Sequence, residues 1–522
     1  MLEHITTLSG PVIGKVHHGV AVFKGIPYGA PPVGDLRFAP PEPPEPWSKP
    51  FNALNFGPIA PQYFKANDLM SHPSGSYTMS EDCLRLNIWT PDYALPSSKL
   101  PVFVFVHGGG FSAGSAGQPL YGRFANFSPQ PLYDGTTLAK LGIVVVTINY
   151  RLGILGFLAT QETYQKYGTT GNWGILDQVL ALIWVRDNIS AFGGDPEKVT
   201  LGGESAGSIS ASALIVSPIA KGLFNKAILQ SGTVLSITQF PVARGSLEKA
   251  CRISESILDF LELTDSPSGL KALREVDFKI LGRLSALSMD FRNISPFALS
   301  PVLDDYVIPK DPIAKLTKGE INRVKVLLGF NQDEGNLFLP KEKDPMVIDS
   351  IYQAFLGAEG TQIFKTHFPV DERNSPIARV RQALSLAAFQ APTKRFADFA
   401  SLWEDVFLYR FNFVTPLARV MGLGAHHAAE LPFVFGTLPL GGVVWGQGSQ
   451  YLAEFMQSRW ASFIATGNPN PKDKIVSNEV WPNYFAKYPN VILLEKKIKA
   501  MPLPLKNSLE FMAQVFFGEL EL

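Results

Sequence analysis

The chain has 522 residues, of which 46% are hydrophobic and 18% are charged, and its formal net charge at neutral pH is zero. This composition can build a large buried core and excludes long disordered stretches. Because a neutral chain offers no broad cationic surface, and no apolar run is long enough to cross a bilayer, we expect neither a nucleic-acid partner nor a stable membrane anchor.

Cysteine and histidine usage limits the redox and metal chemistry that we expect. Cys83 and Cys251 are too few for a disulfide framework. The histidine pairs at 17–18 and 426–427 have no plausible third ligand nearby, so we expect no metal, and no cofactor is implied. The first residues lack the basic segment and the apolar segment of a secretory signal, so we expect a cytoplasmic protein.

Short apolar runs alternate with helical patterns along the chain. Strands are predicted at 101–106, 142–149, 199–202, within 222–230, at 324–329 and at 406–411. Between them, apolar residues recur at helical spacing over 176–184. This alternation predicts an α/β fold with a mainly parallel central sheet flanked by helices, whose active site lies at the carboxyl ends of the strands. The less regular segments at about 232–302 and 341–405 are predicted to be helical insertions that cap the active site, within a single domain over 1–522.

The first predicted strand runs directly into His107 and three glycines at 108–110. Glycines in this position could cradle a phosphate, but the Lys-Ser or Lys-Thr that completes a P-loop does not follow. The backbone N–H groups of such a turn can instead converge on one oxyanion. His107 itself is equally well explained as a packed residue that holds the turn.

The sequence at 203–207 reads G-E-S-A-G, follows the predicted strand 199–202 and precedes helix-compatible residues. This pattern is typical of a nucleophile elbow, a sharp turn from strand to helix that exposes a serine hydroxyl. Glycines flank the serine because a Cβ atom at those positions would clash with the neighbouring backbone. Ser205 would then stand at a helix N-terminus, which favours a developing negative charge.

A serine nucleophile needs a base and a carboxylate that orients the base. Asp333 and Glu334 follow the fifth predicted strand, and His426 and His427 follow the sixth. Either pair alone is typical of a surface loop, and the spacing does not choose within a pair. Their order after Ser205 is nevertheless the Ser–acid–His order of α/β-hydrolases, which favours acyl transfer.

With these motifs, the chain resembles the type-B carboxylesterase family, closest in style to the bacterial para-nitrobenzyl esterases. The resemblance extends over nearly the whole chain and rests on F-K-G-I-P-Y at 23–28, P-P-V-G at 31–34, E-D-C-L at 81–84, G-N-W-G-I-L-D-Q at 171–178, N-I-S-A-F-G-G-D at 188–195 and G-N-P-N at 467–470. It implies an α/β-hydrolase fold and a serine carboxylesterase that works through an acyl-enzyme without a cofactor.

The resemblance also implies roles for individual residues. It selects Glu334 and His427 from the two adjacent pairs as partners of Ser205 in a catalytic triad. The implied oxyanion hole consists of the N–H groups of Gly109, Gly110 and Ala206. Glu204 and Ser231 match an acidic residue beside the nucleophile and a supporting serine near the triad.

Architectural features follow from the same resemblance. Two structural ion pairs are implied, Arg37 with Glu81 and Arg151 with Asp177. Animal relatives pair the cysteine of the E-D-C-L motif with another cysteine, but here Ala60 stands in the partner position. Cys83 is therefore expected to be unpaired, as in a reducing compartment.

We expect the substrate to be a small-molecule ester, short- to medium-chain or aryl, and the protein to be a monomer or weak homo-oligomer. A lipase, a cholinesterase-like enzyme and a hydrolase of carbamates or natural-product esters remain alternatives on the same fold. A non-catalytic binding protein is a further alternative, which the intact triad disfavours. Phe111, Leu337 and Phe435 flank the triad loops and are candidates for either the pocket or the core.

Overall fold

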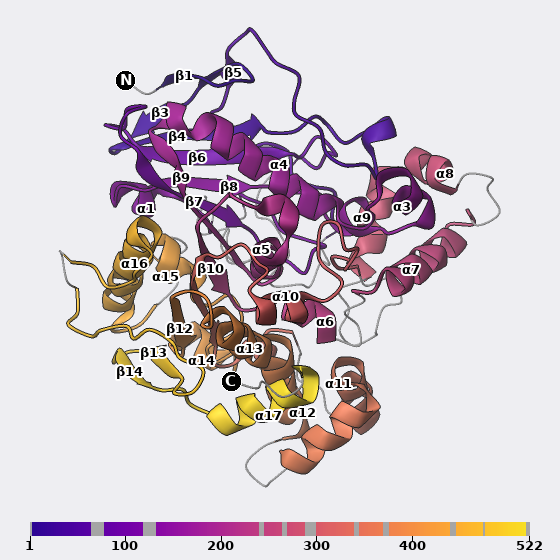
Figure 1. The fold of residues 1–522 in the computed structure, drawn as a ribbon, viewed down its shortest axis with the longest axis vertical. Coiled ribbons are helices and arrows are strands. Elements are labelled where there is room, and N and C mark those ends of the chain that lie inside the picture. Colours follow the sequence, from indigo (N-terminus) through magenta and orange to yellow (C-terminus); the bar gives the residue numbers. More distant parts are fainter. Residues whose placement is uncertain are drawn as a thin grey trace.

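The computed structural model describes residues 3–63, 78–117, 132–239, 245–263, 269–287, 299–338, 344–368, 375–438, 445–472 and 476–517. In these parts of the chain, an eleven-stranded sheet has the order β14-β13-β12-β11-β10-β9-β7-β8-β6-β4-β3, and a small sheet has the order β1-β2-β5 (Figure 1). The strands are β1 (His4–Thr6), β2 (Pro11–Ile13), β3 (Lys15–His17), β4 (Val20–Pro27), β5 (Phe51–Asn52), β6 (Arg85–Pro91), β7 (Leu100–Val106), β8 (Val144–Ile148), β9 (Gly194–Glu204), β10 (Lys226–Gln230), β11 (Lys325–Asn331), β12 (Val406–Phe411), β13 (Asn490–Leu494) and β14 (Lys499–Pro502).

The middle of the large sheet is parallel. Every neighbouring pair from β8 through β7, β9, β10, β11 and β12 to β13 runs in the same direction. The pairs toward both edges, which involve β3, β4, β6 and β14, are antiparallel. The six strands expected from the sequence correspond to β7 through β12, so the prediction of a mainly parallel α/β sheet is confirmed.

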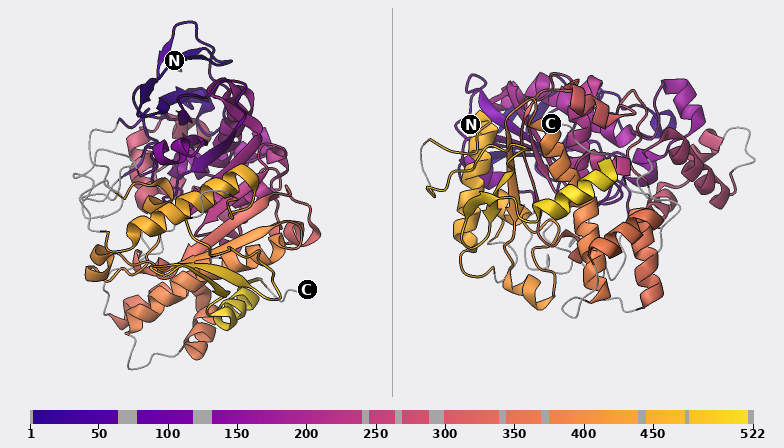
Figure 2. Two further views of the ribbon diagram at one scale, coloured as in Figure 1. Left: turned by 90° about the vertical axis from the view of Figure 1, so that its left-hand side faces the viewer. Right: turned by 60° about the horizontal axis from the view of Figure 1, so that its bottom comes forward.

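Helices cover both faces of the large sheet. The helices are α1 (Thr136–Lys140), α2 (Gly153–Phe157), α3 (Gln161–Tyr167), α4 (Trp173–Asn188), α5 (Ala206–Val216), α6 (Leu235–Gln239), α7 (Leu247–Phe260), α8 (Gly269–Glu275), α9 (Phe278–Leu287), α10 (Pro312–Lys318), α11 (Pro345–His367), α12 (Pro376–Leu384), α13 (Ala391–Ala400), α14 (Pro416–Val420), α15 (Leu431–Phe435), α16 (Ser449–Thr466) and α17 (Lys506–Phe517). One core joins the sheet to α4, α5 and α13, and a second core joins its other face to α1, α15 and α16. The left view of Figure 2 shows the long golden-orange α16 lying across the strands.

The two segments predicted as insertions are helical in their described parts. The first contributes α6, α7, α8 and α9, and the second contributes α11, α12, the π-helix η6 (Ser385–Gln390) and α13. In Figure 1, α7 and α8 lie at one side of the molecule, and α11 and α12 lie at the end opposite β1. Their role as caps over the active site, and the single-domain organisation, stay predictions.

Both predicted ion pairs are present. Arg37 contacts Glu81, and Arg151 Nη2 lies 2.7 Å from Asp177 Oδ1, with both side chains of the second pair buried. Cys83 is buried and free, which confirms the expectation that it is unpaired. Burial raises the pKa of the Cys83 thiol far above its usual range, and the charge of Asp177 adds to the effect.

Candidate active site

The elbow predicted around Ser205 lies between β9 and α5. Ser205 has φ 56° and ψ −122°, a strained conformation for a residue with a side chain, and its N–H donates to Gln230 O at 2.8 Å. Gly207 is required by the close approach of β7, because a Cβ atom there would lie 2.0 Å from Val106 O. The local chain therefore forms the sharp strand-to-helix turn that the G-E-S-A-G sequence predicts.

The glycine turn after β7 lies directly against this elbow. A Cβ atom on Gly108 would lie 2.7 Å from Glu204 Oε2 and 3.0 Å from Ser205 Cβ. Gly109 and Gly110 have φ values of 110° and 59°, and their N–H groups make no hydrogen bond within the described residues. These two donors are thus free, next to the serine, to bind an oxyanion.

His107 packs beneath the glycine turn and contacts its backbone. Its ring stacks on Tyr150 with centroids 4.5 Å apart, and its Nδ1 lies 2.8 Å from Gly108 O. Burial lowers the pKa of His107 to about 4, so the ring is neutral at physiological pH. The alternative that His107 is a packed residue holding the turn is the one that the geometry favours.

Of the two adjacent carboxylates, Glu334 reaches a histidine. Its Oε2 lies 2.6 Å from His427 Nδ1, and its Oε1 accepts a hydrogen bond from the backbone N–H of Asn331 at 2.7 Å. The Glu334 side chain is completely buried, and that of His427 is nearly so. This contact fixes the imidazole with Nδ1 toward the carboxylate and leaves Nε2 for another partner.

The neighbouring members of each pair have other contacts. Asp333 Oδ2 accepts a hydrogen bond from Ala425 N at 2.9 Å, which ties the loop after β11 to the loop after β12. His426 Nδ1 lies 2.8 Å from His427 O, and Asn331 Nδ2 donates to His426 O at 2.7 Å. Asp333 and His426 thus hold the two loops together, and among these four residues the described side-chain contact joins Glu334 to His427.

Glu204 occupies the position on His427 where the serine would be expected. Glu204 Oε1 lies 3.0 Å from His427 Nε2, whereas Ser205 Oγ makes no hydrogen bond to any part of the chain that the structure describes. The sequence pattern placed Glu204 beside the nucleophile but did not predict this contact with the base. His427 Nε2 therefore faces Glu204 in this arrangement.

Ser231 lies one residue beyond Gln230, whose carbonyl oxygen accepts the hydrogen bond from Ser205. Its φ is 59°, its N–H donates to Gly329 O at 2.9 Å, and its hydroxyl is buried. Ser231 Oγ has no hydrogen-bond partner in the described chain. The residue is thus next to the elbow, but the structure does not connect its hydroxyl to the triad.

Comparisons with known proteins agree with this geometry. A family model described as the carboxylesterase family matches residues 2–512. The chain belongs to the carboxylesterase family. It is 36% identical over 511 residues to the para-nitrobenzyl esterase of Bacillus subtilis (strain 168), covering 95% of each chain. It is also 34% identical to the cocaine esterase of Homo sapiens, covering 89% of this chain and 84% of that protein.

Solved structures place the fold equally clearly. A thermophilic PNB esterase superposes with a TM-score of 0.82 at 32% identity, covering 99% of this chain and 100% of that one. The α/β-hydrolase fold expected from the resemblance is therefore confirmed, and the protein is a serine carboxylesterase that hydrolyses carboxylic esters.

Three buried carboxylates, Glu204, Glu334 and Glu430, act on His427. Burial alone would lower the pKa of His427, but the negative charges of Glu204 and Glu334 outweigh it and raise the pKa to about 9. Burial raises the pKa of Glu204 to about 8, although the charge of His427 opposes the change. The charge of each residue therefore affects the other, and their contact is electrostatic, since neither Glu204 Oε1 nor His427 Nε2 has a hydrogen-bond partner in the described chain.

The third carboxylate, Glu430, is completely buried. It accepts hydrogen bonds from Gln230 Nε2 at 2.8 Å and from Asn331 Nδ2 at 2.6 Å. Burial, together with the nearby charge of Glu334, raises the pKa of Glu430. Because Gln230 also carries the carbonyl that accepts from Ser205, Glu430 links the elbow to the loop of His427.

An aromatic pair that was not predicted from the sequence packs on the base. The rings of Phe338 and Phe389 stack at 5.7 Å, and their centroids lie 4.9 and 4.5 Å from that of His427. Phe389 belongs to the π-helix η6, within the segment expected only as an insertion. These rings pack against the imidazole of His427 and limit its movement.

The described chain holds no group of three or more His, Cys, Asp or Glu side chains that could bind a metal ion. Among the helices that the structure describes, none has the length and apolar character needed to traverse a bilayer. Phe435, a candidate for the pocket, packs instead in the core against Phe105 with centroids 5.0 Å apart.

Proposed function

We propose that Ser205, His427 and Glu334 are the catalytic triad of this carboxylesterase. Ser205 Oγ attacks the ester carbonyl carbon while its proton passes to His427 Nε2. The alcohol departs with that proton, and a water molecule then hydrolyses the acyl-enzyme by the same route in reverse. Glu334 holds the imidazole through Nδ1 and stabilises the imidazolium. The 2.6 Å contact between Glu334 Oε2 and His427 Nδ1 is the observation that carries this proposal.

The tetrahedral intermediate needs donors for its oxyanion. We propose the N–H groups of Gly109 and Gly110, with that of Ala206 at the start of α5 as the third. The free donors of the glycine turn and the contact of Gly108 with the elbow support this assignment. Loss of one such donor typically costs about 3 kcal/mol of transition-state stabilisation.

Glu204 and Ser231 have supporting roles in this proposal. The contact of Glu204 with His427 Nε2 supports a role in setting the charge of the base. Ser231 supports the elbow through its backbone, since its N–H bonds to Gly329 beside the Gln230–Ser205 hydrogen bond. Neither residue exchanges a covalent bond with the substrate.

For the substrate, we propose a small-molecule ester of short to medium chain length or with an aryl group. The names of the relatives support this class, since a para-nitrobenzyl esterase and a cocaine esterase are each at least 34% identical. We further propose a monomer or weak homo-oligomer that does not bind nucleic acid, in accord with its zero net charge. The buried free thiols of Cys83 and Cys251 are compatible with the cytoplasmic location that we propose.

The test is hydrolysis of para-nitrophenyl acetate, butyrate and decanoate by the wild type and by Ser205→Ala. We expect turnover to fall by a factor on the order of 10⁶ in the variant, with a preference for the shorter chains in the wild type. Ser190→Ala is the control, since this exposed serine lies on the helix η3 (Ile189–Phe192). Equal activity of the two serine variants would reject the nucleophile.

The adjacent pairs offer a matched test of the other two roles. We expect Glu334→Gln and His427→Ala to lose several orders of magnitude in kcat, and Asp333→Asn and His426→Ala to retain most of it. A larger loss of kcat in Asp333→Asn than in Glu334→Gln would show that Asp333, and not Glu334, is the carboxylate of the triad.

A further inference from the structure

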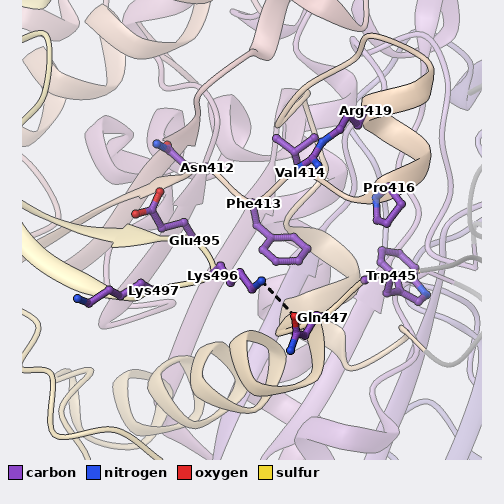
Figure 3. A pocket seen from close by; sticks show the side chains of 11 residues that line it. Asn412, Phe413, Val414, Pro416, Arg419, Trp445, Gln447, Glu495, Lys496 and Lys497 are labelled. Carbon is purple, nitrogen blue, oxygen red and sulfur yellow. Dashed lines mark hydrogen bonds between the residues drawn. The ribbon is translucent and has the colours of Figure 1, made fainter.

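A pocket separate from the triad lies where the chain leaves the carboxyl ends of β12 and β13. Its volume is about 480 Å³, within the range of small-molecule sites. The close view in Figure 3 shows side chains from three segments around it: the residues after β12 with α14, the turn before α16, and the residues after β13. None of the residues assigned to the triad or the oxyanion hole lines this pocket.

One part of the pocket is apolar and rigid. Phe413 and Trp445 line it, and both pack edge-on against Phe433, with centroids 5.4 and 5.9 Å from that ring. Phe433 lies in α15 and is completely buried, so the two lining rings rest on the hydrophobic core. The indole N–H of Trp445 has no hydrogen-bond partner in the described chain. An apolar group of a ligand could pack on these rings without displacing them.

The rim of the pocket is cationic. Arg419, Lys496 and Lys497 line it together with a single carboxylate, Glu495. Within the described ranges, none of these three cations has a carboxylate within 4.0 Å, whereas Glu495 has Lys499 at 3.8 Å. Three uncompensated cations around one cavity favour an anionic ligand.

Lys496 is already held at the pocket. Its Nζ donates to Gln447 Oε1 at 3.2 Å, which is the dashed line in Figure 3. Gln447 is neutral, so this hydrogen bond positions the ammonium group without cancelling its charge. An anion could therefore bind to Lys496 with little further loss of side-chain freedom.

A fourth cation lies on the sheet face that leads to the pocket. Arg410 is only 8% exposed and has no hydrogen bond or ion pair with any described residue. The register of β12 and β13 pairs it with Leu493, and the hydrogen bond from Asn412 N to Leu494 O continues the pairing. By strand alternation, Asn412 and Glu495 of the pocket wall share the face of Arg410. The charges of Asp333 and of Glu495 in the pocket wall act on Arg410 and favour its charged form, so part of the positive charge of Arg410 is compensated.

We propose that this pocket binds an organic carboxylate with an apolar body. The acyl or aromatic group packs on Phe413 and Trp445, and the carboxylate contacts Arg419 and Lys496. Charge-assisted hydrogen bonds to the carboxylate and burial of the apolar body together favour this class over a neutral alcohol or an inorganic anion. Carboxylates are also the class of product that ester hydrolysis releases, so the enzyme itself generates candidate ligands.

The experiment is calorimetric titration of the full chain with 4-phenylbutyrate, 4-phenylbutan-1-ol and inorganic phosphate. Ser205 is first blocked by an alkyl fluorophosphonate, so that binding in the active site does not contribute. We expect 4-phenylbutyrate to bind at one site, at least tenfold more tightly than the other two ligands, and to weaken as salt is raised. Arg419→Gln combined with Lys496→Gln should reduce its affinity at least tenfold. Lys49→Gln combined with Lys221→Gln, exposed cations elsewhere, makes the same change in charge and should have no effect.

Four results would overturn the proposal. Equal affinity for the alcohol would show that the charges of the rim are not used, and equal affinity for phosphate would show that the apolar wall is not used. An affinity unchanged in the Arg419 and Lys496 double variant, with the circular dichroism spectrum of the wild type, would place the ligand elsewhere. If 4-phenylbutyrate binds the unblocked enzyme but not the enzyme blocked at Ser205, its binding site is the active site and the proposal is wrong.

Discussion

Replacing Glu204 by Gln removes the negative charge that lies 3.0 Å from His427 Nε2. His427 must be neutral to accept the proton of Ser205, so kcat/KM should rise with pH as this group loses its proton. The surrounding carboxylates raise the pKa of His427 from 6.5 to about 9, even though burial lowers it, and Glu204 is the largest of their contributions. The sign is therefore definite: without the charge of Glu204, the pKa falls.

The magnitude follows from the same contact. An opposite charge at this distance shifts a pKa by about 1 to 3, and the charge of Glu334 remains in the variant. We expect the acid limb of the profile of kcat/KM against pH to move about one pH unit lower in Glu204→Gln. Since one pKa unit corresponds to about 1.4 kcal/mol, the neutral fraction of His427 on the acid limb should rise by up to about tenfold at the pH values where Glu204, whose own pKa is raised to about 8, is ionised in the wild type.

The assay is the pH profile of kcat/KM for para-nitrophenyl butyrate between pH 5 and pH 10, read as the midpoint of the acid limb. The midpoint is independent of any change that the substitution makes in the plateau. Glu248→Gln is the control, because this exposed residue lies on α7 and pairs only with Arg252. A midpoint that stays in place or moves to higher pH in Glu204→Gln would refute the argument that Glu204 sets the pKa of the base.

Two further predictions concern the scaffold. Arg151→Met leaves Asp177 buried without its ion-pair partner and should lower the free energy of unfolding by about 3–5 kcal/mol in urea, whereas Arg186→Met in the exposed Arg186–Asp187 pair should cost less than about 1 kcal/mol. Gly207→Ala places a Cβ atom 2.0 Å from Val106 O and should cost about 1–3 kcal/mol and most of the esterase activity. Gly269→Ala is the control for the glycine, because its nearest neighbour would lie at 3.7 Å, and equal melting temperatures of the two variants would contradict the argument.

The central strands could be predicted from the sequence because they are buried on both faces and therefore read as continuous apolar runs. All five residues of β8 and all six of β12 are buried. The edge strands lack this signal. β3 alternates between exposed and half-buried residues, and β14 is mostly exposed, so neither stands out from a loop. The sequence therefore does not predict the antiparallel edge strands β3 and β14.

The site shows the same limit at the level of side chains. The order of serine, acid and histidine could be predicted, but the choice within each adjacent pair came from the family pattern. In the structure, Glu334 is buried against His427, whereas the neighbouring Asp333 hydrogen-bonds to Ala425 N. Phe389 gave no signal at all, because its contact with His427 depends on the π-helix and on the packing of a segment far from the triad motifs.

The contact between Glu204 and His427 depends on the strained backbone conformation of Ser205. Side chains of successive residues in a strand point to opposite faces, so Glu204 and Ser205 would be expected to diverge. The positive φ of Ser205 ends this alternation, and Glu204 Oε2 and Ser205 Cβ both lie within 3.0 Å of the position that a Cβ atom on Gly108 would occupy. The same strained turn that exposes the serine therefore also brings a carboxylate to its base. Glu204, immediately before the proposed nucleophile, is consequently placed to control the charge of His427, which is the property that Glu204→Gln measures.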